Sequence, residues 1–171
     1  MKLNTLVQKQ YEILEKVCVN QEIERLVVYD TRTPLAESGV DLGGSTIPQD
    51  DIEGDIYGET KRVYLYPNNE INNELKTTIV IRRENCTLIE EQIGSIKIDI
   101  ICPILYSMVT IENINTNRES EIGDRIIALV NTVNGVVVTN SHESILEDNK
   151  EYNVLTLDLL YTDNLQTVPL A

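Results

Sequence analysis

The sequence predicts an α+β fold in which helices cover one face of a mainly antiparallel sheet, giving two layers. Two amphipathic segments, residues 2–18 and 116–135, space their apolar residues so that one stripe runs along a helix. Between and after them lie short runs rich in Ile, Val and Leu, some alternating with polar residues as half-buried strands do. At 171 residues the chain fits a single domain, 1–171.

The N-terminal part predicts one helix, one strand and a long loop. Residues 2–18 form the helix, and "RLVVYDT" at 25–31 is short and β-branched, which favours a strand. Residues 33–60 then hold five Gly, two Pro and seven acidic residues without sustained periodicity. They predict an irregular acidic loop or insertion, and loops of this length in compact domains are usually functional or disordered.

Three further strands are predicted before the second helix. They are "KRVYLYP" at 61–67, "KTTIVIRREN" at 76–85 and "SIKIDIICPIL" at 95–105. The last begins with strict alternation, and Pro103 then removes a hydrogen-bond donor. Pro103 therefore predicts either an edge position or the end of regular pairing.

The second amphipathic segment carries the best-formed helix signal. Thr116 and Glu119 have the spacing of a capping box, with Asn115 or Asn117 as alternative N-caps. The Asn-Gly pair at 134–135 predicts its end, because Gly adopts the left-handed conformation without strain. Its apolar face consists of Ile122, Ile126, Leu129, Val130 and Val133.

A hairpin is predicted after this helix. The runs 136–146 and 152–162 flank the polar turn "EDNKE". Alternate residues from Leu155 to Tyr161 share one face, which we expect the helix to cover. The C-terminal tail, 163–171, is apolar enough to dock on something but too short to fold alone.

Charge and composition exclude some classes of function. The chain has 14 basic and 28 acidic residues, a net charge of −14, which argues against a surface that grips nucleic acid through phosphate contacts. An acidic wall would still let DNA pass without adsorbing, although the acidity could equally serve only solubility. No targeting segment is visible and no apolar run approaches the roughly 18 residues that cross a membrane, so we expect a soluble protein. The cysteines Cys18, Cys86 and Cys102 match no metal or redox spacing and predict reduced packing residues.

No catalytic, cofactor or metal motif is assigned. Nucleophile elbow, Walker loop and dinucleotide fingerprint do not occur. Acidic residues recur at alternate positions of 50–59, but an EF-hand loop needs Gly and Glu where Ile56 and Arg62 stand. A solvated acidic loop is therefore preferred to a calcium site.

One enzymatic alternative stays open. Asp99 and Asp158 lie on predicted strands, and paired carboxylates could hold Mg²⁺ in a metal-dependent nuclease. Each also occupies the polar side of its strand's alternation, so outward solvation explains both. His142, the single histidine, is interpreted as a solvent-facing strand residue.

The order of elements resembles the head-to-tail connector proteins of tailed bacteriophages, most closely the tail-terminator or tail-completion group. The resemblance is carried by "LNTLVQKQYEILEKV", by a long strand followed by "NTNRESEIGDRIIALVNTV" and a Gly, and by a hairpin ending in "YNVLTLDLLYT". It covers roughly residues 1–30 and 76–163, and the sequence departs from the pattern at 33–75.

The resemblance implies a structural virion protein with a tail-terminator-like fold. Its copies would form a six-fold or twelve-fold ring around the DNA channel, without cofactor or membrane. Adjacent portal, neck or tail-tube proteins would contact it, and genomic DNA would pass through without specific binding. It would be assembled in the host cytoplasm and located at the head-to-tail junction.

Besides the ring subunit and the nuclease, a third possible function is a monomeric adaptor that binds another protein through a strand edge and the tail after Asp163.

Within a ring we expect the acidic loop to project into the lumen or onto the next ring. The loop residues that would make the lumen or inter-ring contact are Asp50, Asp51, Glu53, Asp55 and Glu59.

Overall fold

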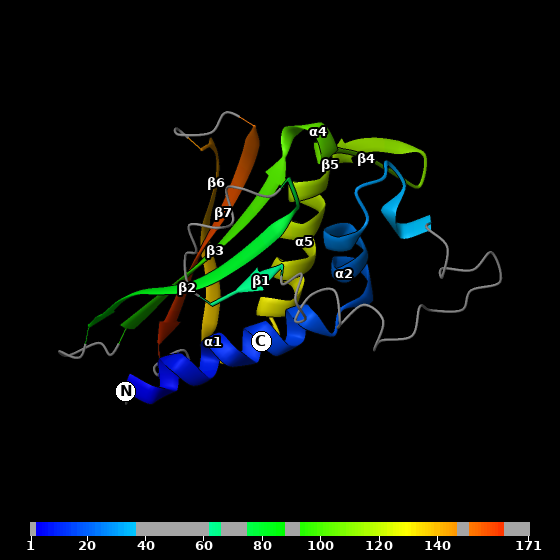
Figure 1. The fold of residues 1–171 in the computed structure, drawn as a ribbon. Coiled ribbons are helices and arrows are strands. Elements are labelled where there is room, and N and C mark those ends of the chain that lie inside the picture. Colours follow the sequence, from blue (N-terminus) through cyan, green and yellow to red (C-terminus); the bar gives the residue numbers. More distant parts are fainter. Residues whose placement is uncertain (1–2, 37–61, 66–74, 88–92, 147–150, 163–171) are drawn as a thin grey trace, which may run out of the picture.

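The computed structural model shows the expected α+β architecture and describes residues 3–36, 62–65, 75–87, 93–146 and 151–162. A sheet forms one layer and helices form the other (Figure 1). The helices are α1 (Leu3–Cys18), α2 (Gln21–Val28), the 3-10 turn η1 (Pro34–Ala36), α4 (Ile104–Ser107) and α5 (Arg118–Val130). The strands are β1 (Val63–Tyr64), β2 (Thr78–Thr87), β3 (Ile93–Pro103), β4 (Met108–Ile111), β5 (Ile114–Asn117), β6 (Val136–Ile145) and β7 (Tyr152–Thr162).

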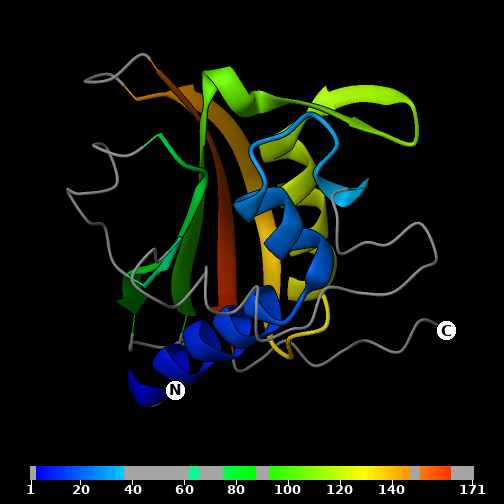
Figure 2. The same ribbon diagram turned by 45° about the vertical axis from the view of Figure 1, so that its right-hand side comes forward.

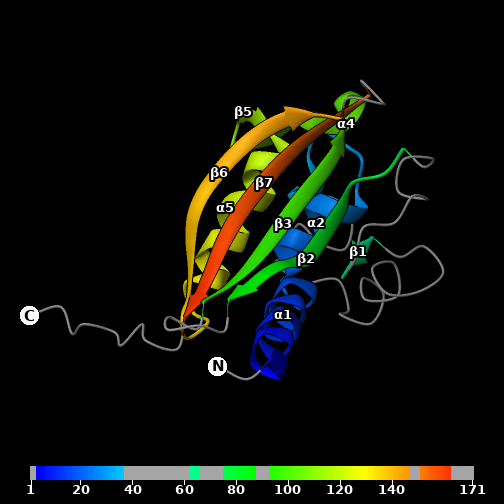
Figure 3. The ribbon, with the colours of Figure 1, turned by 90° about the vertical axis from the view of Figure 1, so that its left-hand side faces the viewer.

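The main sheet has the order β1-β2-β3-β7-β6. The short β1 pairs in parallel with β2, whereas the other three pairings are antiparallel. The predicted hairpin of β6 and β7 is confirmed, and β6 forms the outer edge of the sheet (Figure 3). Pro103 ends β3, which lies inside the sheet, so of its two predicted roles it terminates pairing.

The core lies between the sheet and the helices, which cover only one of its faces (Figure 2). Every second residue of β3 and β7 points into it, and the predicted inward face of β7 is buried. Inward positions of the strands meet α1 and α5. Central residues of this core are Ile96, Ile98, Ile100, Leu157 and Ile122. On the outward face, a second and smaller cluster is buried around Val80, Ile101, Tyr152 and Val154.

The long helix α5 forms where it was predicted, but without the capping box. Thr116 lies in strand β5, and the N-cap is the predicted alternative Asn117, whose side chain makes no capping hydrogen bond. The capping box is wrong because Glu119 is engaged elsewhere: Ser107 Oγ donates to its two carboxylate oxygens at 3.0 and 2.9 Å. The N-terminus of α5 is therefore held by side-chain contacts with α4.

The strand predicted at 25–31 is wrong. Its first residues belong to α2, which begins after Asn20, whose side chain accepts a hydrogen bond from the Ile23 amide at 3.0 Å. Ile23, Leu26 and Val27 are completely buried at helical spacing. A β-branched run was mistaken for a strand because the residues before it, which complete the helical stripe, were left out.

A second, two-stranded sheet of β4 and β5 was not predicted. Its two-residue turn places Glu112 and Asn113 at φ of 51° and 67°, the left-handed conformations that a type I′ hairpin requires. The Thr110 amide donates to the Arg32 carbonyl at 2.6 Å, which ties the hairpin to the segment after α2. The hairpin projects from the same end of the molecule as α4 (Figure 1).

Of the three cysteines, Cys18 and Cys102 are buried free thiols, as predicted for packing residues. None of the helices within the described ranges has the length and apolar content required to span a bilayer.

Candidate interaction surfaces

The acidic loop residues singled out from the sequence, Asp50 to Glu59, lie outside the described residues. The C-terminal tail, 163–171, lies outside them as well. The proposed lumen or inter-ring contact of the loop therefore stays a prediction. The structure instead directs attention to surfaces formed by the sheet edge and by α4.

The two carboxylates of the nuclease alternative lie on the face of the sheet opposite the helices. Asp99 accepts hydrogen bonds from Arg82 Nε and Thr156 Oγ1, both at 2.8 Å. Lys97 Nζ lies 3.7 Å from Asp158 Oδ1. Both acids are thus paired with cations from neighbouring strands.

These pairings also act on the cations. Partial burial lowers the pKa of Arg82, but the hydrogen bond and charge of Asp99 and the nearby Glu84 outweigh it, and the net shift is upward. The hydrogen bond to Glu84 is the main cause that raises the pKa of Lys97. A divalent ion would have to displace these cations before it could use the carboxylates. Within the described ranges, no three His, Cys, Asp or Glu side chains are grouped as metal ligands.

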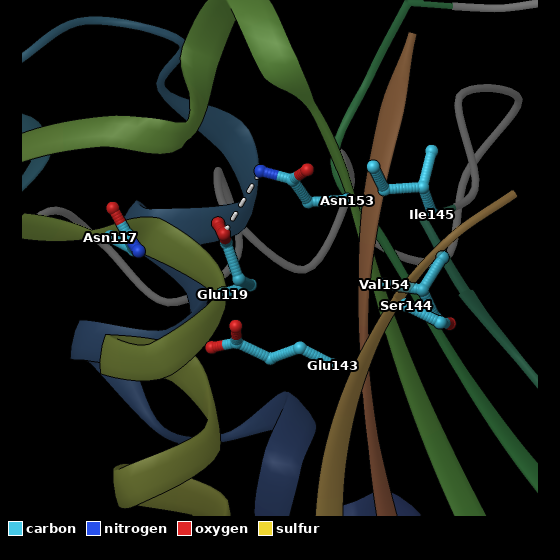
Figure 4. Close-up of a pocket in the computed structure, with 7 residues that line it drawn as sticks. All are labelled: Asn117, Glu119, Glu143, Ser144, Ile145, Asn153 and Val154. Carbon is cyan, nitrogen blue, oxygen red and sulfur yellow. Dashed lines mark hydrogen bonds between the residues drawn. The ribbon is translucent and has the colours of Figure 1, made fainter. Parts of the chain in front are cut away.

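A polar pocket of about 250 Å³ opens between the start of α5, the end of β6 and the start of β7. Glu119 lies on its α5 side, almost fully buried, and Asn153 Nδ2 donates to it at 3.2 Å (Figure 4). Glu143 extends from β6 toward α5 (Figure 4). The lining contains two carboxylates and no Lys or Arg, so it is electronegative: Asn117, Glu119, Glu143, Ser144, Ile145, Asn153 and Val154.

Next to this pocket, the buried Arg118 fastens α2 and α4 to α5. Its Nε donates to the Tyr106 carbonyl at 2.8 Å, and its Nη2 donates to the Thr31 carbonyl at 2.7 Å. Its Nη1 donates to the carbonyls of Leu26 and Tyr29. Burial lowers the pKa of Arg118, although nearby acidic groups oppose this. This residue fixes the position of the α4 end of the molecule.

Exposed apolar side chains gather at that end. Of nine exposed large hydrophobic residues within the described ranges, six lie on α4, on the β4–β5 hairpin, or where β2 begins and β6 ends. An apolar pocket of about 350 Å³ there is lined by Leu75, Pro103, Ile104, Leu105 and Glu151. We call this surface the α4 patch: Leu75, Ile104, Leu105, Met108, Ile114 and Ile145. Clustered exposed apolar groups are typical of protein interaction sites.

The second candidate surface is the open edge of the main sheet. Strand β6 pairs with β7 on one side, and no described strand pairs with its other side. From Thr139 to Ile145 every residue of this strand is exposed. Unpaired strand edges of this length are templates for another strand.

Sequence reasoning missed the α4 patch because α4 and the β4–β5 hairpin were not predicted. It did not assign the open edge to β6 because strand order does not follow from any single segment. The basic pair at 82–83 lies near the opposite edge of the main sheet. Arg83 is exposed on β2, the last long strand at the opposite end of the sheet.

Comparison with known proteins identifies no relative: no family model, no curated protein and no solved structure matches this chain.

Proposed function

We propose that this protein is a structural subunit of a ring at the head-to-tail junction of a tailed bacteriophage, as a tail terminator or connector. The observation that carries the proposal is the presence of two separate candidate contact surfaces on one two-layer fold. The α4 patch suits contact with a neighbouring protein of different kind, and the open β6 edge suits lateral contact between copies.

The charge of the chain supports a passive channel. Each copy carries −14, and copies arranged around an axis would surround it with negative potential. Near physiological salt this repulsion extends about 8 Å from the surface, enough to keep a threaded polyanion from adsorbing. No step of this function requires a reacting group.

The α4 patch is assigned to the stacking contact with the adjacent portal, neck or tail-tube protein. Its members are apolar and exposed in the isolated chain, as interface residues are before assembly. The acidic loop at 33–60 is proposed to face the lumen or the next ring.

Location in the particle tests the proposal. Antibodies against the purified chain should decorate the junction between head and tail in intact particles of the phage that encodes it. Decoration elsewhere, or particles that lack the chain, would contradict the proposal. Particles made with Leu105→Asp should accumulate as unjoined heads and tails, whereas the matched change Val19→Asp, an exposed apolar residue distant from α4, should not.

A further inference from the structure

We propose that copies of this chain join head to tail by strand addition, the β6 edge of one copy pairing antiparallel with the β2 edge of the next. This inference rests on the proposed ring and names the contact that builds it. The exposed stretch of β6 would form the new strand pairing with the part of β2 that extends beyond β1.

The direction of the strands suits this contact. Strand β2 runs antiparallel to β3, β3 to β7, and β7 to β6, so β2 and β6 run in opposite directions. A second copy placed beside the first in the same orientation therefore presents its β2 antiparallel to β6. The contact is heterologous, and a repeated heterologous contact closes into a ring when its rotation divides the circle.

The lengths of the open edges also agree. On the outer side of β2, strand β1 occupies only Ile79 and Val80, and no other described strand pairs there. Beyond β1, the Ile81 carbonyl accepts a hydrogen bond from Gln10 Nε2 at 2.7 Å. Residues 82–87 therefore extend past both contacts, and on β6 the exposed stretch covers 139–145. If the second copy continued the sheet without any shift along the strand direction, its β1 would obstruct the end of β6 in the first copy.

A shift along the strands removes this obstruction. Arg83 pairs with Ile96, and Glu143 pairs through Leu155 with Ile100, so the two residues lie four positions apart along β3. Moving the second copy by about 13 Å brings Arg83 opposite Glu143. An even shift keeps both side chains on the helix-covered face, and it carries β1 past the last residue of β6.

Charge complementarity favours this register. Arg83 is the exposed basic side chain of β2 on the helix-covered face, whereas Arg82 lies on the opposite face and is paired with Asp99 and Glu84. Residues 136–146 contain no Lys or Arg, and Glu143 borders the electronegative pocket that also contains Glu119. In the shifted register Arg83 meets Glu143.

Pairing β6 with β6 of a second copy, the symmetric alternative, would bring two electronegative edges together. Opposite charges on directly facing strand residues stabilise a sheet, whereas like charges destabilise it. The charges of the two edges therefore favour the head-to-tail arrangement over the symmetric one.

Charge reversal tests the contact. Glu143→Arg and Arg83→Glu should each raise the apparent dissociation constant of the assembly about tenfold or more, because like charges then meet at every interface. The double variant should restore assembly, as measured by native mass spectrometry and light scattering. The matched controls are Asp124→Arg and Arg32→Glu, which reverse exposed charges away from both edges and should assemble like the unaltered chain.

Each other outcome is decisive. Rings that form normally from both single variants would overturn the inference and leave the proposed function intact. A dimer sensitive to Glu143→Arg but not to Arg83→Glu would show symmetric β6 pairing and would also overturn it. An unaltered chain that stays monomeric at all concentrations would remove the proposed ring, and the inference with it.

A covalent test covers the case in which a charge reversal impairs folding. In a Cys86→Ser background, the pair Arg83→Cys and Glu143→Cys on one chain should give, on oxidation, a ladder of species larger than a dimer. Each single cysteine variant should stop at a dimer. Absence of the ladder from folded, assembled protein would overturn the inference.

Discussion

At the scale of single residues, Arg118 shows how a charge is accommodated in the interior. Its guanidinium is buried, and its donors reach carbonyl groups of Leu26, Tyr29, Thr31 and Tyr106. These carbonyls lie at the end of α2, after it, and on α4, so they have no partner within a regular element. A buried cation is tolerated when its hydrogen-bonding capacity is used in this way.

Replacing this cation should be costly. Arg118→Met should lower the free energy of unfolding by about 3–5 kcal/mol, because several buried carbonyls lose their donor at once. Urea unfolding followed by circular dichroism measures the change. The control Arg32→Met removes an exposed arginine and should cost little. A loss below about 1 kcal/mol for Arg118→Met would contradict the role assigned to it.

The thiol of Cys102 gives a prediction about pH. Burial raises the pKa of this thiol from 9.0 to about 12. Between those values the folded protein keeps a proton that the unfolded chain loses, so folding stability should fall as pH rises through this window. The stability that the folded protein gains from this pKa difference is fully present below pH 9.

Thiol reactivity checks the same feature. In a Cys86→Ser variant at pH 8, Ellman's reagent should react with neither of the two remaining buried thiols while the protein is folded. Both should react once urea unfolds the chain. Rapid reaction of one thiol in the folded protein would show that the interior near Cys18 or Cys102 is open.

At the scale of elements, the periodicity of apolar residues predicted a helix or strand correctly where that element buries one continuous stripe of apolar side chains. Helices α1 and α5 and strands β2, β3 and β7 were predicted because their spacing of apolar residues reflects a covered face. Strand β6 is mostly exposed and was predicted as the partner of β7 across a polar turn. The prediction missed helix α2 because this helix spans only eight residues and has β-branched residues at its end. The four-residue α4 and the β4–β5 hairpin are too short to show a period.

The packing of α5 on the sheet depends on Gly123. A Cβ atom at this position would lie 2.6 Å from Leu155 Cδ2 and 3.6 Å from Ile100 Cδ1. The missing side chain lets the helix approach β3 and β7 closely. This contact could not be predicted from sequence, since a glycine inside a helical pattern only lowers the helix propensity.

A pair of substitutions on α5 tests this close approach. Gly123→Val should lower the free energy of unfolding by about 1–3 kcal/mol, since the added methyl groups overpack the helix–sheet contact. Ala128→Val introduces the same side chain on the exposed side of α5 and should cost less than about 1 kcal/mol. Equal effects in thermal or urea unfolding would show that Gly123 is not a packing position.

At the scale of the whole molecule, the sequence predicted the fold class but not the surfaces that support the proposed function. Layers follow from patterns within elements, whereas a sheet edge depends on strand order, which no single segment specifies. The α4 patch brings together residues from 75 to 145, and their proximity follows only from the packed sheet.

We propose that the domain functions through shape, repeated contact and negative charge. In this proposal its lateral contacts would join edges that differ in charge, and its α4 patch would contact a stacked neighbour. The same surfaces would explain why exposed apolar groups are concentrated at one end of the domain.

The most direct test of this central claim is the mass of the purified full-length chain in its assembled state, with imaging of the same sample. The account predicts closed rings of six or twelve copies with an open centre. A monomer or a closed dimer across all accessible concentrations and salt conditions would contradict it.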